Sequence, residues 1–307
     1  MSVSRADDLD TMMMADPLLA DLWARPYSLL APPLQLHPFV LASPHSGRLY
    51  PSTFLAQSRL AGISLRRSED AYVDELFGGM VDRGVPLLAA RFPRAYVDAN
   101  RSSDELDPDM FDSPLGLPVN ATSPRVSAGL GAVPRLIRDG AEIYQTRLSA
   151  NDAVQRLSRL HSPYHAALAK LVQETFDRFG TAVVIDCHSM PSVNAAPDIV
   201  LGDRYGTAAA HPLLRCAEQA LLAAGFKVAR NVPYAGGYTT SIYGRPAKAI
   251  HALQIEVNRA LYLDEERITP NPRFDRVASR LTSALERVVT IDAALLRPHH
   301  GMGIAAE

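Results

Sequence analysis

Five short apolar runs constrain the fold of this chain most strongly. They read PFVLAS (38–43), VPLLAARF (85–92), TAVVIDC (181–187), DIVLG (198–202) and AIHALQIEV (249–257). Several are apolar on both faces, which is typical of central strands that helices cover on both sides. Segments with apolar residues at helical spacing lie between them, within 69–84, after Ser162-Pro163 and after Asn271-Pro272. This alternation predicts an α/β fold, a three-layer sandwich with a mixed, mostly parallel central sheet.

The composition is that of one large globular unit. Of 307 residues 47% are hydrophobic, which is enough for a sizeable core, so we expect a single domain over 1–307. Ser162 and Pro163 are expected to start a helix, with the serine as the N-cap. The segment 102–134 is rich in Asp, Pro, Gly and Ser, which predicts a long loop excursion over the surface. Long ordered loops often border a binding site.

The charge and cysteine content exclude several classes of function. A net charge of -2 gives no basic field to attract nucleic acid or an anionic membrane. Two cysteines cannot form a disulfide framework and suit a reducing cytoplasm. The N-terminus carries Asp7, Asp8 and Asp10 and is not typical of a signal peptide, and no run approaches the roughly 20 apolar residues that span a bilayer. We therefore expect a soluble, cytoplasmic protein whose partner is a small molecule, with a homo-oligomer as one possible assembly.

Polar clusters follow or interrupt four of the apolar runs. Open α/β sheets bind ligands at the carboxyl ends of their strands, so these clusters are expected to meet at one edge of the sheet. They contain, in chain order, His45; Asp98, Asn100 and Arg101; Asp186 and His188; and Glu256.

His45 and His188 are candidate metal ligands. Neutral imidazole binds zinc well, and a catalytic zinc site needs three protein ligands and one open position. Either histidine alone is equally consistent with a capping or surface residue, but their matched positions after strands favour a shared metal. A third ligand is available from Glu69 or Asp70, although acids at a helix start are also favoured by the helix dipole. Rings more than about 8 Å apart would exclude a shared zinc ion.

Glu256 lies inside an apolar strand, between Ile255 and Val257. A carboxylate in such a position is costly to bury unless it is paired or used in chemistry. Strand alternation turns it away from its apolar neighbours and toward a cleft. Two interpretations follow: an ion pair with Arg259, or a general base beside a zinc-bound water.

A series of motifs between residues 43 and 265 resembles the N-formylglutamate amidohydrolases, also called N-formylglutamate deformylases. In order they are SPHSG, RAYVDANR, SPYH, DCHSMPS, DIVLGD, GGYTTSIYG and LQIEVNRALYLDE. That family is in turn similar to zinc carboxypeptidases and aspartoacylases. The resemblance implies a carboxypeptidase-like sandwich, one zinc ion per chain, and hydrolysis of N-formyl-L-glutamate to formate and L-glutamate in histidine degradation.

The resemblance also implies roles for individual residues. His45 and His188 would be zinc ligands, and Asp70 matches the family's acidic residue before a Val-Asp-x-Leu segment, so it would be the third. Glu256 would be the general base. One position departs from the carboxypeptidase pattern, because a glutamate ligand three residues after the first histidine is replaced here by Arg48, which cannot bind zinc.

The implied mechanism is metal-assisted amide hydrolysis. Zinc lowers the pKa of its bound water toward about 7, and Glu256 takes the proton and later delivers it to the leaving amine. Arg101 or Arg94 would stabilise the oxyanion. Alternatively, Asn100 and Arg101 would orient the substrate carboxylate, as a guanidinium does with two parallel hydrogen bonds, and leave Arg94 for the oxyanion.

Two further expectations concern the binding surface. The adjacent glycines of GGYTTSIYG indicate a mobile loop from which Tyr238 or Thr240 would touch the substrate.

Two alternative functions are a related zinc hydrolase with another acyl or peptide substrate, and a metal-free protein that binds carboxylates through Asn100 and Arg101.

Overall fold

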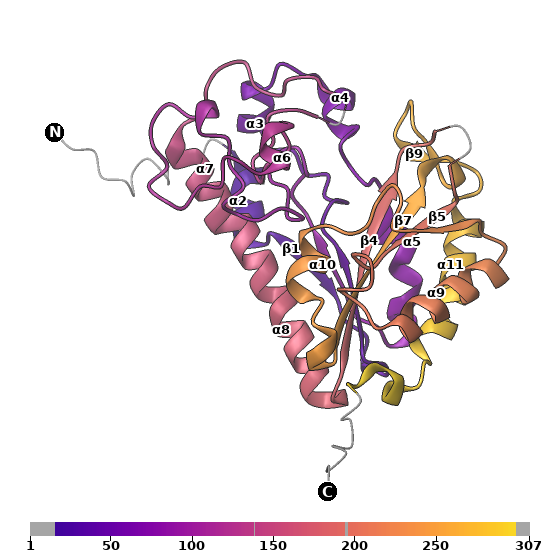
Figure 1. Ribbon diagram of the computed structural model, residues 1–307. Coiled ribbons are helices and arrows are strands. Elements are labelled where there is room, and N and C mark those ends of the chain that lie inside the picture. Colours follow the sequence, from indigo (N-terminus) through magenta and orange to yellow (C-terminus); the bar gives the residue numbers. More distant parts are fainter. Residues whose placement is uncertain (1–15, 138, 194–195, 299–307) are drawn as a thin grey trace, which may run out of the picture.

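A seven-stranded mixed sheet forms the centre of the computed structural model, which describes residues 16–137, 139–193 and 196–298 (Figure 1). The strand order is β1-β3-β2-β4-β7-β5-β6. The pairs β2–β3, β2–β4, β4–β7 and β5–β6 are parallel, and β1–β3 and β5–β7 are antiparallel. The strands are β1 Tyr27–Leu30, β2 Phe39–Ser43, β3 Leu87–Ala90, β4 Ala182–Met190, β5 Ile199–Gly202, β6 Val228–Arg230 and β7 Ile250–Asn258, with a separate pair β8 Leu263–Asp264 and β9 Thr269–Pro270.

The five apolar runs coincide with β2, β3, β4, β5 and β7, so the sequence predictions for these strands are confirmed. The residues of β2, β3, β4 and β5 are all buried, which explains why each run is apolar on both faces. The edge strands β1 and β6 are short and only partly buried, and no pattern predicted them. The polar stretch Asp186–Ser189 belongs to β4 itself, which continues to Met190.

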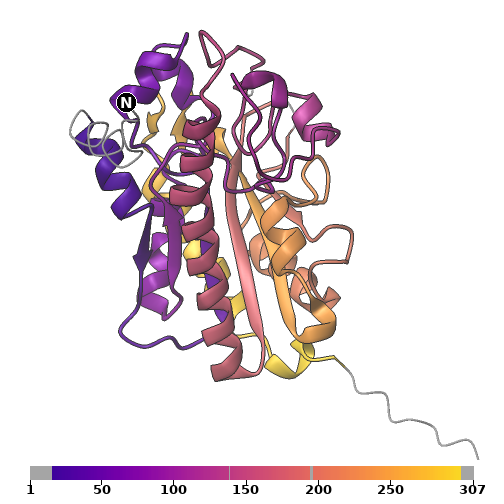
Figure 2. The same ribbon diagram turned by 90° about the vertical axis from the view of Figure 1, so that its left-hand side faces the viewer.

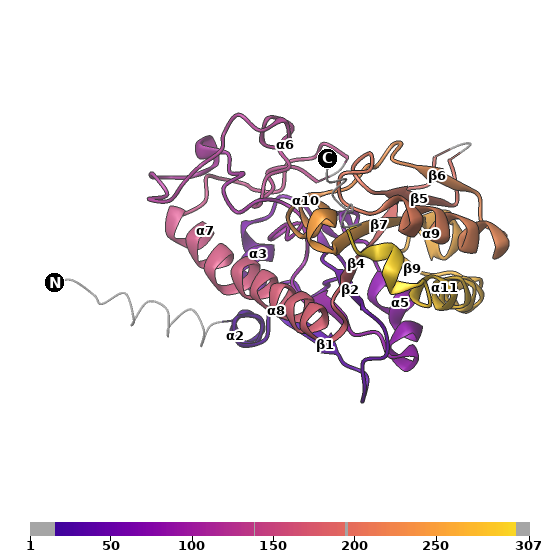
Figure 3. The same ribbon diagram turned by 60° about the horizontal axis from the view of Figure 1, so that its bottom comes forward.

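Helices cover both faces of the sheet, as Figure 1 and Figure 3 show. Alternate strand residues divide between two cores: Ile185 and Ile255 belong to the core beneath α5, α9 and α11, and Val184 and Ala252 to the core beneath α2 and α8. The predicted three-layer sandwich with a mixed, mostly parallel sheet is therefore confirmed. The helices are α2 Pro17–Ala24, α3 Ser52–Gln57, α4 Gly62–Arg66, α5 Val73–Phe77, η1 Gly78–Arg83, η2 Pro108–Met110, α6 Pro124–Ser127, α7 Ala150–Arg156, η3 Leu157–His161, α8 Ser162–Phe179, α9 His211–Ala223, α10 Tyr238–Tyr243, η4 Pro246–Lys248, η5 Arg259–Leu261, α11 Phe274–Val289 and η6 Ala293–Leu296.

The segment α8 continues a helical path that begins before Ser162. Residues 150–179 form one continuous helix in which η3 is a π-helical turn, and Ser162 has helical dihedral angles of φ -62° and ψ -44° (Figure 2). Pro163 has no N–H to donate, and its ring would clash with the carbonyl four residues earlier in a regular helix. A π turn in the preceding residues widens the helix at this point. The expected N-cap at Ser162 is therefore wrong, because the proline is accommodated within a helix.

Two segments named in the sequence analysis need separate mention. Residues 102–134 hold only two short helical segments, η2 and α6. The N-terminal Asp7, Asp8 and Asp10 lie outside the described residues. Within the described ranges, no helix combines the length and apolar character needed to cross a bilayer.

Gly47 permits a close backbone contact just after β2. A Cβ atom at this position would lie 2.1 Å from Phe92 O and 2.7 Å from the carbonyl carbon of Arg91. We expect Gly47→Ala to lower the free energy of unfolding by roughly 2 to 3 kcal/mol, because backbone rather than a flexible side chain must move. Urea denaturation measures this change.

Gly62→Ala is the matched control. Gly62 begins α4 and has no atom within 4 Å of its hypothetical Cβ, so alanine there should leave stability unchanged or raise it by about 0.5 to 1 kcal/mol. Equal midpoints for the two variants would contradict the packing argument for Gly47.

Candidate active site

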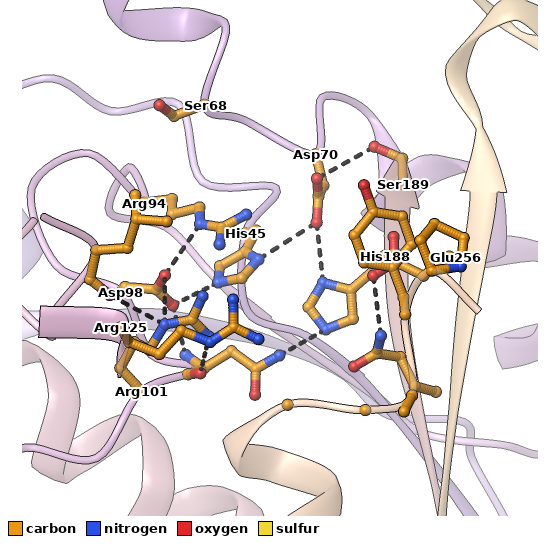
Figure 4. A pocket seen from close by; sticks show the side chains of 18 of the residues that line it. His45, Ser68, Asp70, Arg94, Asp98, Arg101, Arg125, His188, Ser189 and Glu256 are labelled. Atoms are coloured by element: carbon orange, nitrogen blue, oxygen red, sulfur yellow. Dashed lines mark hydrogen bonds and ion pairs between the residues drawn. The ribbon is translucent and has the colours of Figure 1, made fainter. Parts of the chain in front are cut away.

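A cavity of about 450 Å³ lies at the carboxyl ends of the central parallel strands (Figure 4). Its wall includes most of the residues that the sequence singled out, although they come from segments far apart in the chain. These are His45, Asp70, Arg94, Asp98, Asn100, Arg101, His188 and Glu256.

His45, Asp70 and His188 form a buried cluster on the floor of this cavity. Asp70 Oδ2 lies 3.3 Å from His45 Nδ1 and 2.9 Å from His188 Nδ1. One potential ligand atom from each residue lies within 4.8 Å of the others, and the two ring centroids are 4.9 Å apart. The rings are thus well inside the limit for a shared ion, and the set could hold a metal.

A carboxylate lies against the far side of each imidazole. Asp98 Oδ1 is 2.7 Å from His45 Nε2, and Asp186 Oδ1 is 3.0 Å from His188 Nε2. These carboxylates orient the rings so that both Nδ1 atoms face Asp70. Metal-binding histidines usually have such a partner on the other ring nitrogen, so the donor set fits a metal ion.

The carboxylates of the cluster are held in their charged form. Burial would raise the pKa of Asp70, but hydrogen bonds with His188 and His45 outweigh it and hold that pKa well below its usual value. Burial acts in the same way on Asp98, whose pKa is nevertheless held well below its usual value by Arg94, His45 and Arg101. The floor of the cavity is therefore suited to a cation.

Asp70, not Glu69, faces the histidines. The carboxylate of Glu69 accepts hydrogen bonds from Arg66 Nε at 2.9 Å and from Tyr50 OH at 2.8 Å, away from the cluster. Arg48, which occupies the position of a carboxypeptidase ligand, instead pairs with two acidic side chains of α5. The backbone N–H of Asp70 donates to His45 O at 3.0 Å, which ties two members of the cluster together.

Arg259 holds the other oxygen of Asp70. Its Nη2 donates to Asp70 Oδ1 at 3.1 Å, and its Nε donates to Ser189 Oγ at 3.0 Å. Ser189 in turn donates to Asp70 Oδ1 at 3.2 Å. The ion pair of Arg259 is thus with Asp70 and not, as one interpretation of the sequence had it, with Glu256. This arrangement leaves Asp70 Oδ2 directed at the histidines.

Glu256 lies beside His188 because β4 and β7 pair in register, with these two residues opposite each other. Neighbours in a parallel pair point to the same side of the sheet. The Glu256 side chain lines the cavity and accepts a hydrogen bond from Gln254 Nε2 at 2.9 Å (Figure 4). A carboxylate is therefore held next to the candidate metal cluster by the backbone of two central strands.

Arg94 and Arg101 both line the cavity but differ in their restraints. Arg94 Nε donates to Asp98 Oδ2 at 3.0 Å. The same carboxylate also contacts His45 through Oδ1. Arg101 is buried, with Nε donating to Leu130 O at 3.1 Å and Nη1 to Asn100 O at 2.6 Å. Arg94 is thus linked to the candidate metal cluster through the side chain of Asp98.

The amide of Asn100 supports the site from within. Its Oδ1 accepts the backbone N–H of Thr239 at 2.8 Å, and its Nδ2 lies 3.0 Å from His188 Nε2. Two histidines of the long helix hold the backbone of the same segment. His161 Nε2 donates to Arg101 O at 2.9 Å, and His165 Nε2 donates to Ala99 O at 2.8 Å.

His165 is neutral at physiological pH, since burial and the nearby His161 lower its pKa to about 4. A neutral ring carries one N–H, which the bond to Ala99 O uses. The SPYH motif therefore contributes a brace for the Asn100–Arg101 segment, a role that no spacing in the sequence indicated.

The structure does not bring Tyr238 and Thr240 to the cavity wall. Both belong to α10, where a loop was expected, and the Thr240 side chain is buried with Oγ1 donating to Gly237 O at 2.9 Å. The backbone of Gly236 and Gly237 lines the cavity instead. A Cβ at Gly237 would lie 2.4 Å from Asn100 Nδ2, so the glycine is needed for the loop to close over the site.

Arg125 is the main cavity residue that sequence reasoning missed. It belongs to α6 within the excursion 102–134, which reaches the cavity wall through Arg125, Leu130 and Pro134. The only available signal was the expectation that a long ordered loop borders a site.

Comparison with known proteins agrees with this geometry. The model of the family described as N-formylglutamate amidohydrolase matches residues 37–263. The chain belongs to this family. The N-formylglutamate deformylase of Pseudomonas aeruginosa is 29% identical over 243 residues, which cover 75% of this chain and 83% of that protein. The corresponding protein of Pseudomonas putida is 28% identical over 74% of this chain and 82% of its own length.

A crystal structure of N-formylglutamate amidohydrolase from Ralstonia eutropha is also similar. It superposes with a TM-score of 0.81 at 35% sequence identity, over 86% of this chain and 97% of that one. The resemblance inferred from the ordered motifs is therefore confirmed, and this member of the amidohydrolase family has the cluster, the neighbouring carboxylate and the arginines in one cavity.

Replacing Arg259 tests how Asp70 is positioned in this amidohydrolase. We expect Arg259→Met to weaken zinc binding about 10- to 100-fold, because Asp70 loses the contact that directs Oδ2 at the histidines. Competition with a chromogenic chelator measures the affinity, and circular dichroism verifies folding.

Arg267→Met is the control, since Arg267 pairs with Asp264 at 2.9 Å and its side chain is 79% exposed. It should bind zinc as the unmodified protein does. Unchanged affinity in a folded Arg259→Met variant would rule out this role for Arg259.

Proposed function

We propose that this chain hydrolyses the amide bond of N-formyl-L-glutamate to formate and L-glutamate, with about one zinc ion per chain held by His45, Asp70 and His188. The substrate is supported by relatives that are named N-formylglutamate deformylases. The observation that carries the proposal is the buried cluster of two histidines and one aspartate with the Glu256 carboxylate beside it. Three protein ligands are the number that catalytic zinc sites use.

The zinc ion would supply a Lewis acid that makes hydroxide available at about pH 7 and polarises the formyl oxygen. Glu256 accepts the proton of the attacking water on a carboxylate oxygen. The water oxygen bonds to the formyl carbon, the C–N bond breaks, and Glu256 returns the proton to the nitrogen of the departing glutamate. General acid–base catalysis of this kind contributes about 10²- to 10⁴-fold to a rate.

The arginines divide between two negative charges. Arg94 shares Asp98 with His45, so its guanidinium is linked to the cluster where the formyl oxygen becomes negative. Arg101 is fixed to two backbone carbonyls and would bind the α-carboxylate of the substrate. Asn100 supports His188 and the loop at Thr239, while Tyr238 and Thr240 take no part.

The proposal includes the setting of the enzyme. The chain works as one zinc amidohydrolase domain over 1–307 in the cytoplasm, as part of histidine degradation. Cys187 and Cys216 are both unpaired, which supports a reducing compartment. Cys187 is buried in the core beneath α5, where burial raises its thiol pKa well above the usual value, and it has no catalytic role.

Glu256→Gln separates proton transfer from metal binding. The amide keeps the shape of the side chain but cannot accept the proton, so we expect kcat for formate release to fall by about 10²- to 10⁴-fold. Zinc content, measured by elemental analysis, should stay at the level of the unmodified protein. Normal turnover by the variant would remove Glu256 from the mechanism.

Removal of the metal distinguishes a hydrolase from a carboxylate-binding protein. Dialysis against a strong chelator should abolish formate release, and stoichiometric zinc should restore it, since the proposal assigns the lowered pKa of the water and the polarisation of the formyl oxygen to the zinc ion alone. The measurement is the rate of formate release by the chelated protein before and after zinc is added back. A fully chelated protein that still turns over N-formyl-L-glutamate would exclude the zinc mechanism.

A further inference from the structure

Three arginines line the cavity, Arg94, Arg101 and Arg125. Arg94 and Arg101 share the carboxylate of Asp98, with Nε atoms 3.0 Å and 3.9 Å from Oδ2. Arg125 lines the same cavity and forms no ion pair with another residue in the described ranges. One guanidinium at the cavity is therefore available to a ligand.

The backbone of Leu130 fixes Arg125 relative to Arg101. The Leu130 N–H donates to Arg125 O at 2.8 Å, and the Leu130 carbonyl accepts from Arg101 Nε at 3.1 Å. A second hydrogen bond, from Asp98 N to Ala132 O at 2.8 Å, holds the backbone beyond Leu130 against the segment that carries Arg101. The backbone of Arg125 is thus held near the Arg101 side chain through one residue.

The local structure around Arg125 is also ordered. Ser123 caps α6, with its Oγ accepting the Arg125 N–H at 3.2 Å, and the next side chain, Val126, is buried. The positive charges of Arg94 and Arg125 act on Arg101. Burial lowers the pKa of Arg101, Asp98 opposes this, and the positive charges of Arg94 and Arg125 add to the lowering. A dianion placed between Arg101 and Arg125 would relieve this repulsion.

The depth of the groups matches the order of charges along a dicarboxylic substrate. The metal cluster is buried on the cavity floor, Arg101 is buried beside it, and Arg125 is exposed while still lining the cavity. In an N-acyl acidic amino acid both carboxylates branch from the α-carbon, and the side-chain carboxylate is the farther of the two from the amide. A formyl group offers little surface to recognise, so selectivity must come from the amino-acid part.

We propose that Arg125 binds the side-chain carboxylate of the substrate and so restricts this enzyme to N-acyl derivatives of acidic amino acids. The inference rests on the proposed function, with the amide at the His45–Asp70–His188 cluster and the α-carboxylate at Arg101. A guanidinium matches a carboxylate with two parallel hydrogen bonds, which a neutral amide side chain cannot reproduce.

The test compares two substrates that differ in this one charge, N-formyl-L-glutamate and N-formyl-L-glutamine. The unmodified enzyme should prefer the first. Arg125→Gln should lower kcat/KM for N-formyl-L-glutamate about 10- to 150-fold, the value of one charged hydrogen-bonded pair, and change kcat/KM for N-formyl-L-glutamine less than about threefold. Arg125→Lys should recover part of the lost kcat/KM, because lysine restores the positive charge but not the two parallel hydrogen bonds of a guanidinium.

Arg135→Gln is the matched control. Arg135 follows in the same part of the chain, pairs with Asp107 at 3.3 Å and does not line the cavity. It should leave both substrates unaffected.

The outcomes separate this inference from the proposed function. No formate from N-formyl-L-glutamate with the zinc-loaded, unmodified enzyme would overturn the proposed function. Normal activity together with an unchanged Arg125→Gln variant, or one that loses both substrates equally, would overturn the role of Arg125 alone. Circular dichroism and thermal unfolding verify that each variant is folded.

Discussion

The site depends above all on the parallel pairing of β4 with β7. Their ladder is in register over its whole length, with His188 opposite Glu256 and Asp186 opposite Gln254. Because the alternate residues point into the hydrophobic core, a shift of one position would exchange polar and apolar faces. The separation of the His188 imidazole from the neighbouring Glu256 carboxylate is therefore set by backbone hydrogen bonds. Loops supply the other two members of the cluster, His45 after β2 and Asp70 before α5.

Around this pair, buried acidic side chains lie close to imidazole and guanidinium groups. Asp98 and Asp186 lie against the two imidazoles, and Arg94 and Arg259 hold outer oxygens of Asp98 and Asp70. Buried charges are tolerated when they are paired and hydrogen-bonded. The cluster is thus organised before any substrate binds. Its side chains do not have to be reordered during binding.

The sequence predicted the parts of this structure that burial or strand ends determine. Apolar runs identified the central strands, and the polar residues at their ends identified His45, His188 and Glu256. The choice of Asp70 over Glu69 depends on tertiary contacts, because Tyr50 and Arg66 hold Glu69 while Asp70 faces the histidines, and spacing does not report this. Edge strands, the helical state of 238–243 and the approach of 123–134 to the cavity arise from tertiary hydrogen bonds, which leave no periodic trace in the chain.

The π turn of the long helix has a consequence for how this protein can vary. An extra residue in one turn rotates everything beyond it by about 100°. Before the turn the helix presents Ala150 and Ala153 to the core, and beyond the turn it presents Leu168 and Val172 to the same core. Loss of a single residue there would put these two stripes out of phase. The number of residues in this helix therefore constrains its packing as much as the identity of its side chains does.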